Sequence, residues 1–371
     1  MRKIIAYPFS NEVVNIVNII KEEYDNTEII LSIPRGWHYV DDMSEIDASE
    51  FTWGEKIGCK MTNLFEEKLD EVDEVIIFDT DSRSKIYDDY ISKIIASIKT
   101  KKIINCFATL GKKDIDLLSD MASKNHVFFK SRSNETNFND EKNYKLRTIE
   151  TPIVGIGNLV SDRSNYDIIS LLAYLFQKMG YSPAIISTNN NLHILDNILV
   201  YTLEKIDTYS SKNILEINNV LKNIEQKRNV DVFMIDIPGA MMKYSNTVFN
   251  NFALGAYCFS QAVDFDYFIL NSVVGNYGVD FYCSLSKCFE TRYGMEIDAV
   301  FVGNKVIDMA ESVERQEIIL NKVPYRYVDE YIHEINEGNE RIEIINSSIS
   351  GRYKAVVKKI IEQLSSDMMI V

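Results

Sequence analysis

Two strand ends in the C-terminal half carry the residues best suited to phosphate chemistry. In the first, residues 151–164 (TPIVGIGNLVSDRS), an apolar run leads through a glycine-containing loop into a predicted helix. The amides of such a loop and the N-terminus of the helix both point toward a bound anion. This arrangement predicts a nucleotide-binding site formed by Gly155, Gly157, Asn158, Arg163 and Ser164.

The spacing of this segment matches a G-x4-G-K-[ST] phosphate loop with two substitutions. Asp162 replaces the second glycine and adds a negative charge where phosphate would lie, and Arg163 replaces the lysine that reaches the β- and γ-phosphates. Ser164 is either a magnesium ligand or the N-cap of the next helix. The segment is therefore either an altered phosphate loop or a plain strand–turn–helix corner.

The second strand end is residues 232–239 (VFMIDIPG), where an apolar strand ends in Asp236. In P-loop proteins the Asp at this place holds Mg²⁺, and the amide of a glycine such as Gly239 senses the γ-phosphate. The alternative is a turn that closes a buried strand. Asn271 follows a third apolar run, at a place where open α/β sheets bind ligands. The alternative is that Gly275 and Gly278, further along this segment, only supply turns. The predicted nucleotide site thus also includes Asp236, Gly239 and Asn271, with Ser164 and Asp236 as the magnesium ligands.

The remaining motifs give weaker indications of a functional site. Residues 303–308 (GNKVID) are one residue too long for a guanine-reading Asn-Lys-x-Asp and are interpreted as a turn. Asp79 and Asp81 follow an apolar run, where they either hold Mg²⁺ or cap the next helix. There is no G-x-S-x-G, H-E-x-x-H or recognisable Cys–His signature, so the catalytic residues stay unknown.

Charge and composition exclude several functions. The 371 residues include 40 basic and 55 acidic side chains, a formal net charge of −15, which argues against sequence-independent nucleic-acid binding. No stretch approaches the roughly 20 apolar residues that cross a bilayer. The five cysteines show no C-x-x-C spacing, as is usual for a reducing compartment. We expect a cytoplasmic protein that binds neither nucleic acid nor membrane.

Short apolar runs alternate with amphipathic helices, which predicts two α/β domains with parallel sheets. Residues 1–148 are expected to form a Rossmann-like domain, and its polar segment 130–148 reads as a linker. A helix is predicted over residues 54–69. Residues 149–371 are expected to form a P-loop-like α/β sheet. Its predicted strands are 152–155, 183–187, 231–235, 266–270, 299–302 and 341–345.

Five short segments stand out: residues 4–9, 32–37, 155–158, 179–181 and 236–241. They resemble segments of a family of peptide maturation system proteins. That family occurs beside a radical SAM enzyme in clostridial-type gene clusters for ribosomally made, modified peptides. The resemblance implies that the partner is a modified-peptide precursor or the radical SAM maturation enzyme, and it carries over no settled activity. Residues 151–371 also resemble a degenerate P-loop fold of the MinD or dethiobiotin synthetase type.

Two functions follow from these patterns. The first is an accessory protein of peptide maturation that binds a precursor peptide or a partner enzyme without efficient nucleotide hydrolysis. The second is an ATP-dependent ligase, carboxylate-activating enzyme or other P-loop NTPase, with Arg163 in place of the usual lysine. Dinucleotide binding by the first domain is disfavoured, because residues 7–11 (YPFSN) lack the glycine fingerprint after the first strand. The oligomeric state, including a homodimer, stays open.

Overall fold

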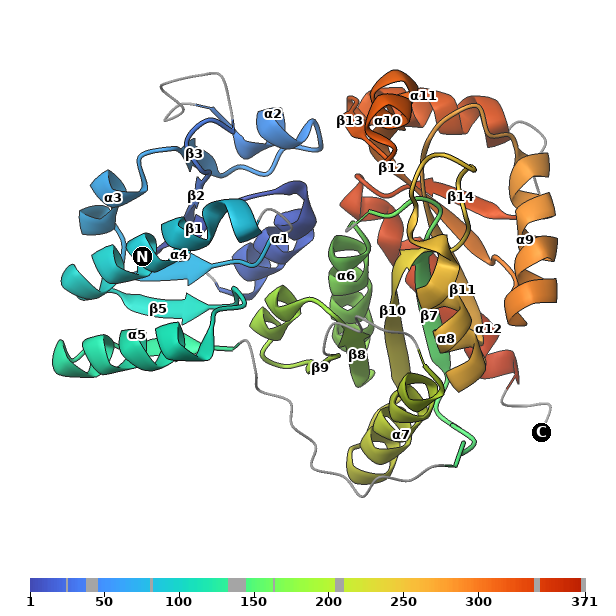
Figure 1. The fold of residues 1–371 in the computed structure, drawn as a ribbon, viewed down its shortest axis with the longest axis horizontal. Helices are drawn as coiled ribbons and strands as arrows, with labels where there is room; N and C mark the ends of the chain where they lie inside the picture. The colour runs from blue at the N-terminus through green and yellow to red at the C-terminus, as the bar shows by residue number, and fades with distance from the viewer. Residues whose placement is uncertain are drawn as a thin grey trace. The chain divides into compact units, whose positions relative to one another are not determined.

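In the computed structural model the chain forms two compact units (Figure 1). Unit 1 comprises residues 1–52, 56–137 and 189–196, and unit 2 comprises residues 53–55, 138–188 and 197–371. The structure describes all residues except 25, 38–45, 81–82, 133–144, 163, 204–209, 337–340 and 368–371. Most of the predicted linker, together with Asp81 and Arg163, therefore lies outside the described residues.

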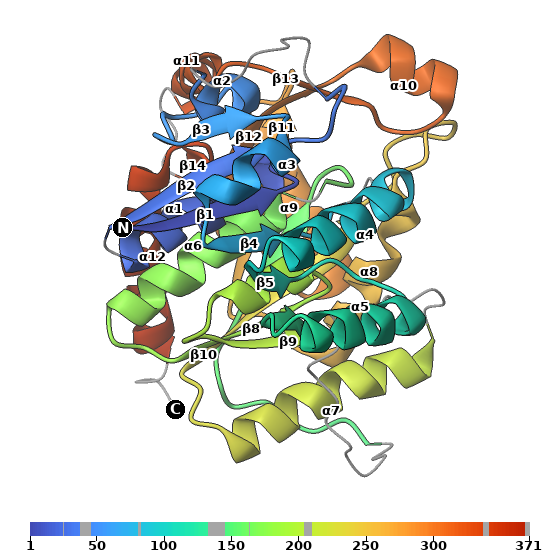
Figure 2. The same cartoon turned by 90° about the vertical axis from the view of Figure 1, so that its left-hand side faces the viewer.

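Unit 1 is built on a six-stranded parallel sheet with the order β3-β2-β1-β4-β5-β6, of which Figure 2 labels β3 to β5 in this order. This is the strand order of dinucleotide-binding sheets, in which the direction of winding reverses between the first and fourth strands. The predicted parallel α/β sheet is confirmed. Its strands are β1 (Arg2–Tyr7), β2 (Thr27–Ser32), β3 (Lys60–Thr62), β4 (Glu74–Ile77), β5 (Ile103–Cys106) and β6 (Phe129–Ser131).

Helices cover this sheet with their apolar faces. Ile94 and Ile98 of one helix and Leu118 of another share a buried core with Val75 and Ile104 of the strands. This i, i+4 spacing places one stripe of each helix against the sheet. The helices are η1 (Asn11–Val13), α1 (Val14–Glu23), α2 (Ala48–Thr52), α3 (Phe65–Lys68), η2 (Leu69–Glu71), α4 (Arg83–Lys99) and α5 (Lys112–Lys124).

The helix predicted over residues 54–69 is wrong. The segment instead forms a loop, the edge strand β3 and the short helix α3. Gly58 has φ +69°, which interrupts a helix, and Asp47 accepts hydrogen bonds from the N–H groups of Ile57 and Gly58 at 3.2 and 2.7 Å. These contacts hold the backbone in a loop conformation that the local apolar spacing did not reveal.

Residues 189–196, which follow β8 in the chain, belong to unit 1. Within this segment Asn191 accepts the N–H of Asp79 at 2.6 Å and donates its side-chain amide to the carbonyl of Asp79 at 3.0 Å. The hydroxyl of Thr109 donates to the carboxylate of Asp79 at 3.0 Å. Asp79, just after the end of β4, is buried, and these hydrogen bonds hold it in place. The segment contains η3 (Asn190–Ile194).

Unit 2 is built on an eight-stranded sheet with the order β13-β12-β11-β7-β10-β8-β9, to which β14 adds beside β12 (Figure 1). All pairs are parallel except β12 with β13, which are antiparallel. The strands are β7 (Ile153–Asn158), β8 (Pro183–Ser187), β9 (Leu199–Thr202), β10 (Val232–Ala240), β11 (Tyr267–Val274), β12 (Ala299–Ile307), β13 (Leu320–Lys322) and β14 (Glu343–Asn346).

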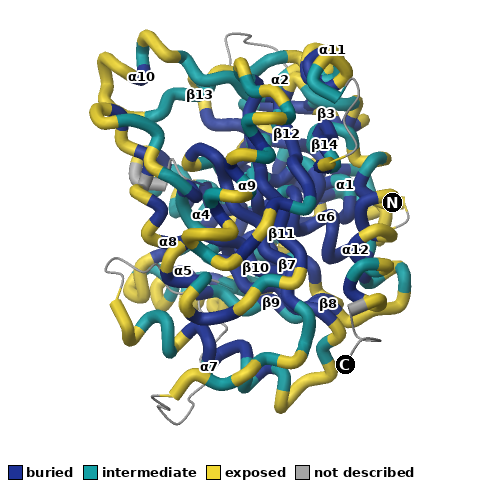
Figure 3. The backbone as a smooth tube through the Cα atoms, turned by 90° about the vertical axis from the view of Figure 1, so that its right-hand side faces the viewer, coloured by how far each residue is buried: buried dark blue, intermediate teal, exposed yellow. Residues whose placement is uncertain are grey.

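The central strands of this sheet are buried on both faces, as Figure 3 shows for β7 and β11. Alternate residues such as Phe233 and Ile235 join one core with α7, α8, α9 and α11, while α6 and α12 contact each other outside that core. Helices on both faces explain the continuous apolar runs of these strands. The helices are α6 (Asn165–Lys178), α7 (Ser211–Lys227), η4 (Asn251–Ala253), α8 (Leu254–Ala262), α9 (Val279–Tyr293), α10 (Met309–Arg315), α11 (Tyr325–Asn336), η5 (Ser350–Arg352) and α12 (Tyr353–Asp367).

Among the described residues, no helix is both long enough and apolar enough to cross a membrane.

Candidate functional site

The carboxyl ends of β7, β10 and β11 bring three of the predicted site residues together. Asn158 at the end of β7 is the direct register partner of Asn271 on β11, and Asp236 on β10 pairs with Ile156 of β7. The chain passes from one side of β7 to the other between β10 and β11. Open α/β sheets bind their ligands at such a point, outside the carboxyl ends of the strands.

Gly155 and Gly157 lie inside β7, because this strand runs three residues further than the sequence indicated. A Cβ on Gly155 would lie 2.5 Å from the ring of Phe265, and one on Gly157 would lie 2.5 Å from Sδ of Met241 and 2.9 Å from the ring of Phe268. Both glycines thus make room for large side chains that pack across the strand.

The loop after β7 already uses part of its hydrogen-bonding capacity. Leu159 donates its N–H to the carbonyl of Asn271 at 2.8 Å, and Ser161 donates its N–H to Oδ1 of Asn250 at 2.8 Å. Leu159 and Val160 are buried. A phosphate cradle requires several amides that converge on one empty position. In this corner, two amides that a cradle would use are directed to protein acceptors.

A chain of polar contacts continues from this loop to β12. Asn271 donates to Oδ1 of Asn158 and to the hydroxyl of Ser164, both at 2.8 Å. Ser164 in turn donates to Asp162 at 2.5 Å. The ammonium of Lys305 lies 2.6 Å from Oδ1 of Asp162, with side-chain exposures of 16% and 10%. The carboxylate that departs from the phosphate-loop pattern is therefore neutralised by a lysine from a distant strand.

Asp236 is held in place on both carboxylate oxygens. Its Oδ1 accepts the side-chain amide of Asn165 at 3.1 Å, and its Oδ2 accepts the hydroxyl of Ser187 at 3.1 Å. The same amide of Asn165 also reaches the carbonyl of Ile156 at 3.3 Å, tying α6 to β7. Asp236 is only 2% exposed. These hydrogen bonds compensate for the cost of burying the carboxylate.

Gly239 lies within β10, where the pairing with β7 shifts register between Asp236 and Ala240. Its φ is +81°, a conformation that glycine adopts without strain. Its carbonyl accepts the side-chain amide of Asn158 at 3.4 Å. The alternative interpretation of this segment, a turn that closes the strand, is wrong, because the segment is an irregularity inside a nine-residue strand.

Within the described part of the chain, two buried amide oxygens in this cluster have no hydrogen-bond partner. They are Oδ1 of Asn165 and Oδ1 of Asn271, on residues that are 1% and 4% exposed. The amide nitrogens of both side chains donate to protein acceptors, which fixes their orientation. A buried carbonyl oxygen without a donor is costly, so each oxygen has capacity for a water or another donor.

The structure adds two lysines that the sequence interpretation did not single out. The turn predicted for residues 303–308 is wrong, because residues 303–307 continue β12. Residues 305–307 pair with β13, which sets Lys305 opposite Lys322. Burial and the neighbouring charge of Lys305 lower the pKa of Lys322 to about 8. Local spacing carries no signal that Lys305 approaches Asp162.

The predicted magnesium ligands do not belong to a cluster of hard ligands. Ser164 and Asp236 come from neighbouring elements, but each is engaged with protein groups. Among the described residues, no group of three or more His, Cys, Asp or Glu side chains is arranged to hold a metal ion.

Comparison with known proteins gives a fold relationship. No protein-family model matches the chain, and no curated protein matches it. The crystal structure of a DUF1611 family protein from Anabaena variabilis aligns with 99% of this chain and 100% of its own, with a TM-score of 0.59 and 10% identity. At this identity the likeness shows the fold alone, a two-unit α/β architecture.

Two further solved structures share only low overall similarity. Homoserine dehydrogenase from S. aureus covers 35% of this chain and 31% of its own at 19% identity, with a TM-score of 0.25. Chloroplast FtsY from Physcomitrella patens covers 65% and 77% at 13% identity, with a TM-score of 0.29. Neither score is high enough to bear on the fold or the site.

Proposed function

We propose that this chain is a cytoplasmic accessory protein of a ribosomal-peptide maturation system. In this proposal it binds the modified-peptide precursor or the radical SAM maturation enzyme and does not hydrolyse nucleotide efficiently. The link to peptide maturation rests on the family resemblance of the sequence. The absence of efficient hydrolysis rests on the chemistry of the corner after β7.

The observation that carries the proposal is that the loop after β7 already uses its polar groups in contacts within the protein. The amides of Leu159 and Ser161 already donate to protein acceptors, and Asp162 contributes a carboxylate that Lys305 neutralises. A triphosphate would meet occupied amides and, in the place of a glycine, a carboxylate that is already paired with a lysine. The described residues of this corner therefore disfavour tight binding of ATP or GTP.

A binding role fits the rest of the chain. The P-loop-like layout supplies a rigid sheet whose connecting loops can recognise a partner without turnover. The net charge of −15 favours association with a basic peptide or a basic surface, because complementary charge raises the rate of encounter.

The test is a pair of measurements on the purified full chain. Phosphate release from ATP and GTP with Mg²⁺ should equal the rate in buffer, and calorimetric titration with ATP, ADP or GTP should give no binding heat. A labelled precursor peptide from a maturation system of this kind should bind. Steady nucleotide turnover that disappears in Asp236→Ala would refute the proposal.

A second candidate function, the ATP-dependent ligase or carboxylate-activating enzyme, is favoured by one observation. The side-chain amide nitrogens of Asn165 and Asn271 donate to Asp236 and Ser164, respectively. The oxygens of the same two amides have no partner among the described residues and would accept hydrogen bonds from a bound water or ammonium. In that enzyme Arg163 would take the part of the usual lysine. Binding heat with ATP and Mg²⁺, lost in Arg163→Ala, would select this function over the first.

A further inference from the structure

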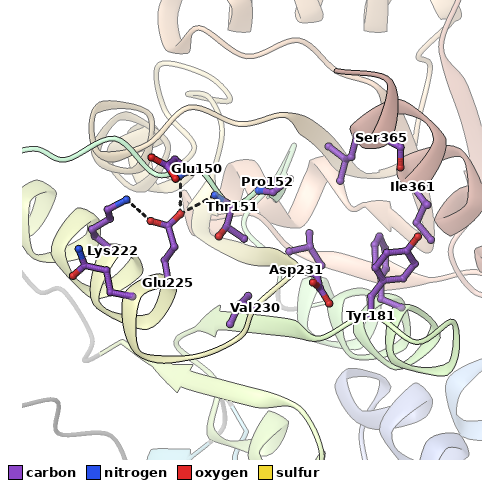
Figure 4. Close-up of a pocket in the computed structure, with 14 residues that line it drawn as sticks. Glu150, Thr151, Pro152, Tyr181, Lys222, Glu225, Val230, Asp231, Ile361 and Ser365 are labelled. Atoms are coloured by element: carbon purple, nitrogen blue, oxygen red, sulfur yellow. Dashed lines mark hydrogen bonds and ion pairs between the residues drawn. The ribbon is translucent and has the colours of Figure 1, made fainter. Parts of the chain in front are cut away.

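Unit 2 has a pocket of about 520 Å³ at the amino edge of its sheet, the edge opposite to the candidate site (Figure 4). It lies where β7 and β10 begin and where α6, α7 and α12 end. Pockets of about 300–1,000 Å³ hold drug-sized ligands or short peptide segments. The function proposed above uses no residue of this pocket.

One side of the pocket is apolar. Figure 4 shows Tyr181 and Ile361 together on this side, and the ring of Tyr181 packs edge-on against Phe176 with centroids 6.0 Å apart. Leu364 of α12 and Val230 before β10 also line the pocket. Tyr181 is 38% exposed, so a ligand that covers it would bury apolar surface.

The other side is charged and held rigidly. Glu225 accepts the N–H groups of Glu150 and Thr151, both at 2.7 Å, and forms an ion pair with Lys222. Burial raises the pKa of Glu225, but the hydrogen bonds from Lys222 and from these amides lower it by more, so the carboxylate stays ionised at neutral pH. Asp231 accepts the N–H of Ser182 at 2.7 Å.

The charged side chains that line the pocket have a negative net charge. Glu150, Glu225 and Asp231 are three carboxylates, and Lys222 is the one ammonium among the lining residues, so the formal charge of the lining is −2. A phosphate, a nucleotide or another anion would be repelled by this lining. An apolar group that carries a cation complements both sides at once.

We propose that this pocket binds a short peptide segment in which a lysine or arginine adjoins a large apolar side chain. The apolar side chain packs against Tyr181, Ile361 and Leu364, and the cation lies toward the carboxylates of Glu150 and Asp231. This inference deepens the proposed function and rests on it for the ligand being a peptide, because it names which part of a precursor the chain would hold.

The experiment titrates the full chain with two acetylated, amidated tripeptides by calorimetry. Both contain phenylalanine and leucine, and they differ in a central lysine or glutamate. The lysine peptide should bind at least about tenfold more tightly than the glutamate peptide, given the opposite charge of the pocket. Glu150→Lys, which retains the backbone N–H that Glu225 accepts, should weaken the lysine peptide by about three- to tenfold.

A blocking variant tests the location. Ser365 is exposed on α12 and lines the pocket, so Ser365→Trp should abolish binding of the lysine peptide by filling the space. Ser366→Trp is the matched control, because Ser366 is exposed on the same helix and does not line the pocket. This control should bind the peptide as the unmodified chain does.

Each outcome decides one of the two proposals. Three results would overturn the pocket assignment. The lysine peptide does not bind the unmodified chain, it binds the Ser365→Trp variant as tightly as the unmodified chain, or it binds the unmodified chain no more tightly than the glutamate peptide does. If the precursor peptide still binds in that case, the proposed function stands without it. If the tripeptide binds as expected but the precursor peptide does not, the pocket assignment stands and the maturation role fails.

Discussion

Replacing Lys305 by methionine should destabilise the chain, because it removes the ammonium that forms an ion pair with Asp162. At 2.6 Å and an effective dielectric constant of about 20, the Coulomb attraction of the pair is about 6 kcal/mol before desolvation is subtracted. Breaking one partner of a buried pair costs about 3–5 kcal/mol. Since both side chains keep some exposure and Ser164 still donates to Asp162, we expect a loss of about 2–4 kcal/mol in the free energy of unfolding.

Urea unfolding followed by far-ultraviolet circular dichroism measures this loss. With a slope of about 3 kcal/mol per molar urea, the midpoint should fall by roughly 1 M. Asp162→Asn should cost less, since the amide oxygen still accepts a hydrogen bond from Lys305. The double variant should lose less than the two single losses combined, with a coupling of about 1–3 kcal/mol.

A matched surface pair serves as the control. Arg315 and Glu311 form an i, i+4 ion pair at 2.5 Å, but their side chains are 57% and 39% exposed. Arg315→Met should change stability by less than about 0.5 kcal/mol, because exposed pairs contribute little. If Lys305→Met also stays within that range, the pair does not hold the corner, and the reasoning that this corner is closed by Lys305 is refuted.

Three further predictions concern packing, pH and thiol reactivity. Gly157→Ala should lower the free energy of unfolding by about 1–3 kcal/mol in the same urea assay, because its Cβ would overlap Met241. Burial and Lys305 lower the folded pKa of Lys322 from 10.5 to about 8, so the folded chain binds fewer protons than the unfolded chain between these values. Stability should therefore rise from pH 8 to pH 10.5, and Lys322→Met should lose this part of the rise in urea titrations across that range. Burial raises the pKa of the Cys106 thiol to about 12, so iodoacetamide at pH 8 should alkylate the partly exposed Cys283 well before Cys106, as mass spectrometry of peptides would report.

The controls for these predictions are available in the chain. A Cβ on Gly351 would meet no packing neighbour within 4 Å, so Gly351→Ala should leave stability near that of the unmodified chain. A Gly157→Ala variant as stable as this control would contradict the packing argument. Equal pH dependence in Lys322→Met and the unmodified chain would contradict the titration of Lys322. Alkylation of Cys106 at the rate of Cys283 would show that its burial is not maintained.

Much of the fold was predictable because long, buried strands leave a local pattern. The runs that became β1, β4, β8, β10 and β11 are almost entirely apolar, since helices cover the central strands of both sheets. The edge strand β3 has only three residues, and pairing with β2 rather than its own composition defines it. No periodic pattern can develop over so short a segment.

The candidate site was predictable in part for a similar reason. Asn158, Asp236 and Asn271 follow apolar runs, and the carboxyl ends of parallel strands lie at the same edge of a sheet. The position of the glycines was not predictable, because a glycine that ends a strand and one that admits a neighbouring ring look alike in sequence.

By itself, the sequence determined the alternation of strands and helices, the acidic balance and the residues at the central strand ends, because each depends on composition or on neighbours within a few positions. Only the tertiary structure decided that Lys305 neutralises Asp162, 143 residues away, and that residues 189–196 join unit 1. It also decided that segments from α6, α7 and α12 enclose a pocket at the amino edge. Such contacts depend on strand order and on side-chain packing between distant segments, and local spacing carries no record of either.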